Sequence, residues 1–211
     1  RSTLFPYTTL FRSQPLGLTK KRRAAAYSRQ TISRNRTPYL LNKDQQAAVD
    51  VLTQRTNGTV LLHGVTGSGK TAVYITYAKH IMAQQKSVIV LVPEIALTSQ
   101  LIAEFEQHFS NILLTHSQQT ESARHQTWLD ALRSTIPRIA IGPRSALFLP
   151  LAHIGAIIID EAHEPSFKQD QSPRYSALRV AATLGAHHGA PVIQGDRKST
   201  RLNSSHQPLS R

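Results

Sequence analysis

The glycine-rich run Gly-Val-Thr-Gly-Ser-Gly-Lys-Thr at residues 64–71 constrains this chain most, because a glycine, four residues and Gly-Lys-Thr form a defined pattern. Glycines permit backbone conformations that residues with a Cβ avoid, so successive N–H groups can turn inward around an anion. A short apolar run precedes it at residues 59–63, and a helical period follows at residues 71–82. This order of strand, glycine loop and helix favours a phosphate-binding loop over an ordinary glycine-rich turn.

The residue types of this loop suit a nucleoside triphosphate and its magnesium ion, which makes ATP and Mg²⁺ the expected cofactors. Lys70 would reach the β- and γ-phosphates, and the Thr71 hydroxyl would ligate Mg²⁺. The helix that begins there would present the positive end of its dipole to the same anion. The expected nucleotide-binding residues of the loop are Gly64, Thr66, Gly67, Ser68, Gly69, Lys70 and Thr71.

A second motif follows the most apolar strand pattern of the chain, where residues 156–159 run into Asp-Glu-Ala-His. Ligands of parallel α/β sheets bind at the carboxyl ends of the strands, where the phosphate loop is also expected. Asp160 would hold Mg²⁺ through water, Glu161 would polarise the attacking water, and His163 would couple the site to its neighbours. With Lys70, these are the predicted catalytic residues. The alternative is a strand that simply ends in solvated acids.

Strand and helix patterns alternate between residues 40 and 195, which predicts an α/β domain with a mostly parallel sheet covered by helices on both faces. The first helix should follow Asn42 as its N-cap. Trp128 falls on the apolar side of one helix with Leu132 and is expected in the core rather than as a base-stacking platform. Other helices are expected at 95–109, 120–133 and 175–187, and other strands at 87–92, 112–114, 138–141 and 191–193.

The net charge of +13 is typical of a nucleic-acid-binding protein, but its distribution removes that argument. Residues 1–37 hold nine Lys/Arg and no acidic residue, whereas residues 38–195 hold twelve basic and eleven acidic residues. The part expected to fold is therefore nearly neutral.

The ends of the chain show neither a helical nor a strand period. Residues 1–13 and 196–211 resemble translated sequencing-adapter DNA, and the alternative is a pair of disordered basic tails. Residues 14–39 are expected to form a basic, solvated linker.

The composition argues against several classes of protein and site. The sequence has no cysteine, which excludes a disulfide framework and a cysteine zinc site in this chain. No apolar run approaches the roughly 20 residues that a membrane helix needs, and the N-terminus has no signal-peptide core. We therefore expect a cytoplasmic protein with no membrane partner.

The chain resembles the PriA family, the bacterial replication-restart DNA helicases of superfamily 2, in four segments that follow in the same order: residues 64–71, 92–100, 141–148 and 160–163. The two middle segments, Val-Pro-Glu-Ile-Ala-Leu-Thr-Ser-Gln and Ile-Gly-Pro-Arg-Ser-Ala-Leu-Phe, are far more specific than the nucleotide motifs. The resemblance covers about residues 40–195. It implies a RecA-like P-loop NTPase fold, the first of two motor domains of a 3′–5′ helicase that uses ATP to move along single-stranded DNA.

The resemblance also assigns residues outside the nucleotide motifs. Gln45 falls where such helicases place a glutamine that reads the adenine edge, since its amide donates and accepts at once. An exposed helix glutamine is the alternative. Segments 93–100 and 142–148 match the DNA-facing motifs, where side chains would hold strand phosphates. The DNA contacts expected there are Thr98, Gln100, Arg144 and Ser145.

The loop at residues 166–175 matches one that is rich in aromatic residues in this family, although Pro173 stands where a tryptophan is common. Phe167 and Tyr175 would stack on bases, and a plain surface loop is the alternative. The DNA contacts expected from this loop are Phe167, Lys168, Arg174 and Tyr175.

The family pattern continues after residue 195 into Gly-Ser-Ala-Thr, whereas this chain turns into its adapter-like tail. We therefore expect a truncated fragment that binds nucleotide weakly and unwinds negligibly. Zinc is expected only in the missing C-terminal part of the parent, whose partners would be single-stranded or forked DNA, single-strand-binding protein and other primosome proteins. An RNA helicase, a restriction-type translocase and a non-catalytic nucleotide-binding module remain as alternatives.

Overall fold

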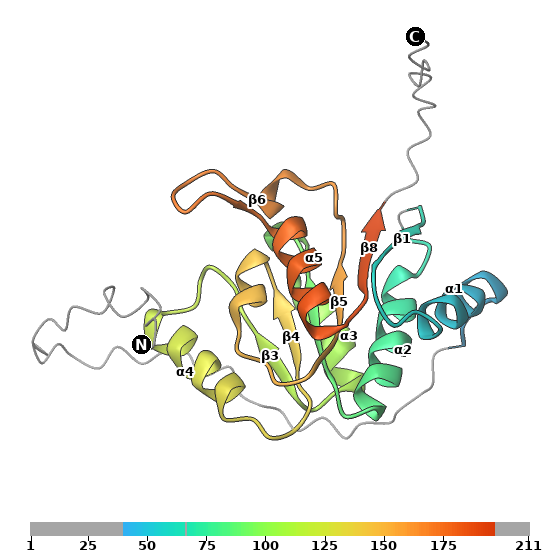
Figure 1. The fold of residues 1–211 in the computed structure, drawn as a ribbon, viewed down its shortest axis with the longest axis horizontal. Coiled ribbons are helices and arrows are strands. Elements are labelled where there is room, and N and C mark those ends of the chain that lie inside the picture. The colour runs from blue at the N-terminus through green and yellow to red at the C-terminus, as the bar shows by residue number, and fades with distance from the viewer. Residues whose placement is uncertain (1–39, 66, 197–211) are drawn as a thin grey trace, which may run out of the picture. The chain divides into compact units, whose positions relative to one another are not determined.

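A six-stranded parallel sheet forms the centre of the computed structural model, which describes residues 40–65 and 67–196 (Figure 1). The strands lie in the order β1-β8-β5-β2-β4-β3, and each pairs with its neighbours in parallel. Every residue of β2 and β5 is buried, because helices cover both faces of these central strands. The strands are β1 (Thr59–His63), β2 (Ser87–Leu91), β3 (Ile112–Leu114), β4 (Ile139–Gly142), β5 (Ile154–Ile159) and β8 (Val192–Asp196).

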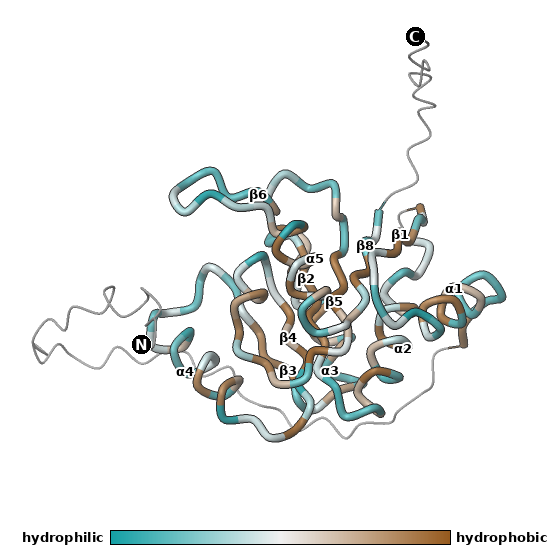
Figure 2. Tube along the Cα trace, in the orientation of Figure 1, coloured by the Kyte–Doolittle hydropathy of each residue, from teal (hydrophilic) through white to brown (hydrophobic). Residues whose placement is uncertain are grey.

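Two apolar layers, one on each face of the sheet, hold the helices in place. Helices α1 (Lys43–Thr53), α2 (Lys70–Ala83) and α3 (Ser99–His108) pack on one face, with the buried rings of Tyr77 and Phe105 among their contacts. Helices α4 (Glu121–Leu132) and α5 (Ala177–His188) pack on the other. Figure 2 shows the hydrophobic residues concentrated along the central strands. The predicted α/β architecture with helices on both faces is confirmed.

The order of the sheet leaves β1 at one edge and β3 at the other. Within the described residues, β1 pairs only with β8, and its Leu61 side chain is 50% exposed. Among the residues that the structure describes, no helix is long and apolar enough to cross a membrane.

Two predicted helices begin later than their sequence period indicates. A 3₁₀ turn, η2 (Glu94–Ala96), precedes α3. Helix α3 begins only at Ser99, because the Thr98 hydroxyl accepts from the Leu101 N–H at 3.2 Å and caps the helix there. Helix α5 begins at Ala177, because the two preceding residues form β7 (Tyr175–Ser176), which pairs antiparallel with β6 (Lys168–Gln169).

The core position predicted for Trp128 is wrong. Trp128 is 42% exposed, Leu132 on the same helix is 53% exposed, and the buried residue of α4 is the small Ala131.

The expected linker at residues 14–39 and the tail at residues 1–13 lie outside the described residues, as does the tail at residues 196–211 except for its first residue. That residue, Asp196, ends β8 and so belongs to the sheet.

Candidate nucleotide site and nucleic-acid surface

The predicted phosphate loop connects β1 to α2 and contains glycines whose positions a Cβ would disrupt. Gly69 has φ +75° and caps α2, and a Cβ there would collide with the side-chain amide of Gln45. A Cβ on Gly64 would lie 2.6 Å from Ser68 Oγ. Glycine at these two positions therefore lets the Gln45 and Ser68 side chains lie close against the loop, whose backbone conformation suits a phosphate-binding loop. Thr66 lies outside the described residues.

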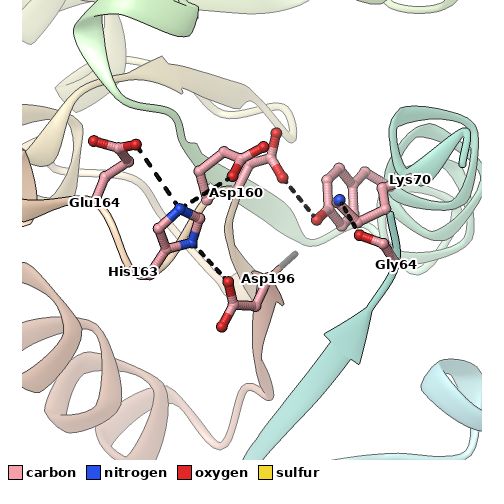
Figure 3. Close-up of polar contacts among 8 residues, drawn as sticks. Gly64, Lys70, Asp160, His163, Glu164 and Asp196 are labelled. Atoms are coloured by element: carbon pink, nitrogen blue, oxygen red, sulfur yellow. Dashed lines mark hydrogen bonds and ion pairs between the residues drawn. The ribbon is translucent and has the colours of Figure 1, made fainter. Parts of the chain in front are cut away.

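Lys70 begins α2 and turns its side chain back over the loop. Its Nζ donates a hydrogen bond to the Gly64 carbonyl oxygen at 2.9 Å, as Figure 3 shows. The half-buried Thr71 follows in the first turn of the same helix. An ammonium group, a hydroxyl and the N-terminus of a helix thus meet at one loop, which fits the phosphates of a nucleotide.

Asp160 follows β5 directly, and its backbone N–H donates to the Leu91 carbonyl at the end of β2. Its Oδ1 accepts a hydrogen bond from the Tyr74 hydroxyl at 3.0 Å. Burial raises the pKa of Asp160, and Glu161 raises it further, whereas the bond from Tyr74 and the charge of Lys70 act in the opposite direction. The acidic motif and the phosphate loop therefore share one electrostatic environment.

Glu161 and His163 lie just beyond this carboxylate in a tight turn. Glu161 has φ +50°, a left-handed conformation that residues with a Cβ rarely adopt and that often marks a functional site. His163 Nδ1 donates to Asp196 Oδ1 at 2.6 Å, and its Nε2 lies 3.6 Å from Glu161 Oε2 and 3.8 Å from Glu164 Oε1 (Figure 3). His163 thus joins the acidic motif to the end of β8.

Gln45 is half-buried against the phosphate loop, which argues against an exposed helix glutamine. Its Nε2 donates to the Ser68 carbonyl at 2.9 Å, and its Oε1 accepts from the Asn42 N–H at 3.0 Å. The second bond belongs to a capping box that confirms Asn42 as the N-cap of α1. Because an amide has a second N–H and a second lone pair, both ends can still face an adenine, and that role remains a prediction.

A family model described as DEAD/DEAH box helicase matches residues 42–187, more than half of the chain. The chain belongs to the DEAD/DEAH box helicase family. Membership implies nucleotide use, in agreement with the loop and the carboxylates that the fold brings together.

Curated relatives of this helicase domain carry the name Replication restart protein PriA. The chain is 39% identical over 168 residues to the protein of Bacillus subtilis (strain 168) and 45% identical over 164 residues to that of Chlamydia trachomatis serovar D. The matches cover 77% and 75% of this chain but 21% and 22% of the relatives. The chain therefore spans about a fifth of the length of these relatives, and the resemblance seen in the sequence is confirmed.

Two solved structures share the fold of the helicase domain. One is the Type ISP restriction-modification enzyme LlaGI in complex with a DNA substrate mimic, at 14% identity and a TM-score of 0.50, with 77% of this chain and 18% of that chain covered. The other is the Pyrococcus furiosus Hef helicase domain, at 15% identity and 0.51, with 73% and 32% covered. At these identities the likeness supports the RecA-like fold alone.

A cavity of about 250 Å³ lies beside the carboxyl ends of β2 and β4, where the two family-specific segments meet the loop after the acidic motif. Glu94, His116, Arg124, Arg144 and Ser145 contribute to its walls. The cavity therefore combines one carboxylate with two guanidinium groups and a histidine.

Glu94 joins two of these segments. Its Oε1 accepts from the Ser117 N–H at 2.7 Å, and hydrogen bonds with Ser117 lower the pKa of Glu94, with smaller contributions from His116 and Arg144. Its carboxylate thus occupies part of a cationic cavity. No local pattern predicts this contact, because a helix and a strand separate Glu94 from Ser117 along the chain.

Arg144 lies in the 3₁₀ helix η3 (Arg144–Phe148) and holds the loop after the acidic motif. Its Nη1 donates to the carbonyl oxygens of Ser166 at 2.6 Å and Lys168 at 3.1 Å. A guanidinium group has five N–H donors, so these bonds leave donors that can face a strand phosphate. The predicted phosphate contact remains a prediction, and the structure adds an internal role.

The stacking role predicted for Phe167 remains a prediction. Its ring is 1% exposed and packs in the core layer that also contains Leu147, although Phe167 also lines the cavity. Tyr175 instead contacts Phe148 edge to face, with ring centroids 5.4 Å apart, and Phe148 is 54% exposed. Phe148, the last residue of the second family-specific segment, was not among the predicted DNA contacts, although an aromatic residue in a DNA-facing motif is a recognisable signal for base stacking.

The other predicted DNA contacts lie at the surface, and their role remains a prediction. Arg174 donates from Nε to the carbonyl of Asp170 at 3.1 Å and so stabilises its own loop. The remaining exposed side chains are those of Thr98, Gln100, Ser145 and Lys168.

Proposed function

We propose that this chain is the ATP-binding motor domain of a 3′–5′ DNA helicase that acts in replication restart and primosome assembly. The carboxyl ends of the parallel strands bring together the phosphate loop, the Asp-Glu-Ala-His carboxylates and the cavity between the family-specific segments. This juxtaposition, in a chain 39% and 45% identical to two proteins named PriA, carries the proposal.

The residues present fit a nucleotide and its magnesium ion. The backbone of the glycine-rich loop suits a phosphate, and the Lys70 ammonium already lies on a carbonyl of the loop, from which it would transfer to a phosphate. Thr71 and Asp160 would hold the metal, which supplies charge neutralisation to the phosphates when it is bound. Glu161 would orient the attacking water and accept its proton.

The same proposal assigns the cavity and its surroundings to single-stranded DNA. Arg144 and Arg124 provide positive charge there, and the His116 ring and the hydroxyl of Ser145 can donate hydrogen bonds to a strand phosphate. Because Arg144 also holds the backbone at residues 166–168, DNA that recruited this guanidinium would act on the loop that follows Glu161. This contact offers a physical route between strand binding and ATP hydrolysis.

The wider setting belongs to the parent protein. We propose that it acts in the cytoplasm on single-stranded and forked DNA, with single-strand-binding protein and other primosome proteins as partners. Zinc is proposed only for parts of the parent outside this chain, which has no cysteine. Because the chain spans about a fifth of its relatives, we expect weak nucleotide binding and negligible unwinding from the chain alone.

The test is a pair of binding titrations on the 211-residue chain. MgATP binding is measured by calorimetry, with Lys70→Ala as the variant expected to lose it. Fluorescence anisotropy then compares single-stranded DNA with RNA of the same length, with Arg144→Ala expected to weaken both. Nucleotide binding with a preference for DNA supports the proposal. An equal or stronger affinity for RNA would favour an RNA helicase, and a lack of nucleotide binding in the unmodified chain would refute the motor assignment.

A further inference from the structure

Tyr74 places a single polar atom in the core between the two nucleotide motifs. The side chain lies on α2, one helical turn after Thr71, and is 2% exposed. Its hydroxyl donates to Asp160 Oδ1 at 3.0 Å, which links α2 directly to the end of β5. The helix that carries Thr71 is therefore bonded through this hydroxyl to Asp160, and these are the two residues predicted to hold magnesium.

A third element fixes the position of the hydroxyl. A Cβ on Gly195 in β8 would collide with the Tyr74 hydroxyl and would also approach Asp160 Oδ1 to 3.1 Å. The space that Gly195 leaves is thus filled by the phenol and the carboxylate together. The Asp160 carboxylate thus lies close to both α2 and β8, with the Tyr74 hydroxyl on its Oδ1.

Burial alone does not explain why this tyrosine has a partner. Tyr77 lies one turn further along α2 and is 1% exposed, yet its buried hydroxyl has no hydrogen-bond partner among the described residues. The helix therefore tolerates a buried phenol that makes no hydrogen bond. Tyr74, by contrast, directs its hydroxyl at the acidic motif.

We propose that Tyr74 is a positioning residue for Asp160, whose hydroxyl holds one carboxylate oxygen so that the other faces the metal of a bound nucleotide. The inference rests on the proposed function, because it concerns the magnesium of the same nucleotide site. The hydroxyl occupies Oδ1 and leaves Oδ2 to magnesium or to its water, so the carboxylate does not need to be ordered when the metal binds. Outer-shell partners of this kind orient ligands and strengthen metal binding.

The matched substitutions are Tyr74→Phe and Tyr77→Phe, each of which removes one buried hydroxyl from the same helix. ATP affinity of the 211-residue chain is measured by calorimetry over a magnesium series and again in EDTA. For Tyr74→Phe we expect the half-saturating magnesium concentration to rise about tenfold, the lower end of what loss of an outer-shell partner costs. Its affinity for metal-free ATP should stay unchanged, and Tyr77→Phe should match the unmodified chain in both conditions.

The magnesium dependence separates a positioning role from a structural one, and thermal unfolding checks that each variant is folded. If Tyr74→Phe and Tyr77→Phe shift the magnesium dependence equally, or if neither shifts it, the proposal is overturned. Should Tyr74→Phe fail to fold, Gly195→Ala provides the second variant, because its added methyl group displaces the same hydroxyl, and it should raise the magnesium requirement in the same way. An unmodified chain that binds no ATP at any magnesium concentration would overturn the nucleotide site itself, an outcome distinct from unshifted magnesium dependence in a chain that binds.

Discussion

Replacing Arg144 with alanine would remove the two hydrogen bonds that join η3 to the loop at residues 166–168. A typical intramolecular hydrogen bond contributes about 0.5–1.5 kcal/mol, and water can replace part of that at this exposed position. We therefore expect the free energy of unfolding to fall by about 1–2 kcal/mol. For a domain of this size the melting temperature should fall by about 3–6 °C.

The loss of order in the loop at residues 166–168 should exceed the loss of overall stability, because both carbonyl acceptors of Arg144 lie in this loop. Hydrogen exchange followed by mass spectrometry should show faster exchange at residues 166–176 in Arg144→Ala, with exchange in β2 and β5 little changed. Arg124→Ala is the matched control, since it removes a charge from the same cavity without a bond to this loop. Unchanged exchange at residues 166–176, or equal acceleration in both variants, would refute the assignment of Arg144 as the residue that holds the loop.

Three further substitutions test other contacts. Glu94→Gln removes the negative charge from the cavity and should raise single-stranded DNA affinity with a steeper salt dependence, as measured by anisotropy; unchanged affinity would contradict this placement of DNA. Because hydrogen bonds with Ser117 lower the pKa of Glu94 in the folded state, its stabilisation is present above the unfolded pKa and lost as the pH falls through the lower folded value. Acid melts of Glu94→Gln should therefore lose stability less steeply below about pH 4.5 than those of the unmodified chain. Gly69→Ala combines a positive φ with a collision against the Gln45 amide, and it should cost at least about 1 kcal/mol and most of the ATP affinity; calorimetry with normal ATP binding would contradict the phosphate-binding role of this loop. Thr98→Ala removes the N-cap of α3 and should lower unfolding free energy by about 1 kcal/mol in urea titrations, whereas an unchanged midpoint would show that η2 and α3 need no cap.

Local patterns predicted the sheet and most of the helices. Continuous apolar runs identified the buried strands β2 and β5, and the Asn42 capping box involves residues only three positions apart. The phosphate loop and the acidic motif were likewise contiguous, so their residue types could be read before their positions were known. These features depend on neighbours in the chain, which is the information that a single sequence contains.

Contacts between distant segments were missed. The bonds from Tyr74 to Asp160 and from Ser117 to Glu94 depend on how the elements pack, and no periodicity encodes them. The helical period placed Trp128 in the core, whereas α4 buries Ala131 in its place. The family resemblance assigned Phe167 to the DNA path, but packing decided that its ring is buried.

The position of β1 at the edge of the sheet affects how this chain behaves at high concentration. Within the described residues β1 has a partner on one side only, and the unpaired N–H and C=O groups of its other side lie beside the half-exposed side chain of Leu61. An edge strand of this kind can pair with the same strand of a second molecule. Reversible self-association that grows with concentration should follow, and Leu61→Lys should suppress it in sedimentation experiments without altering the core.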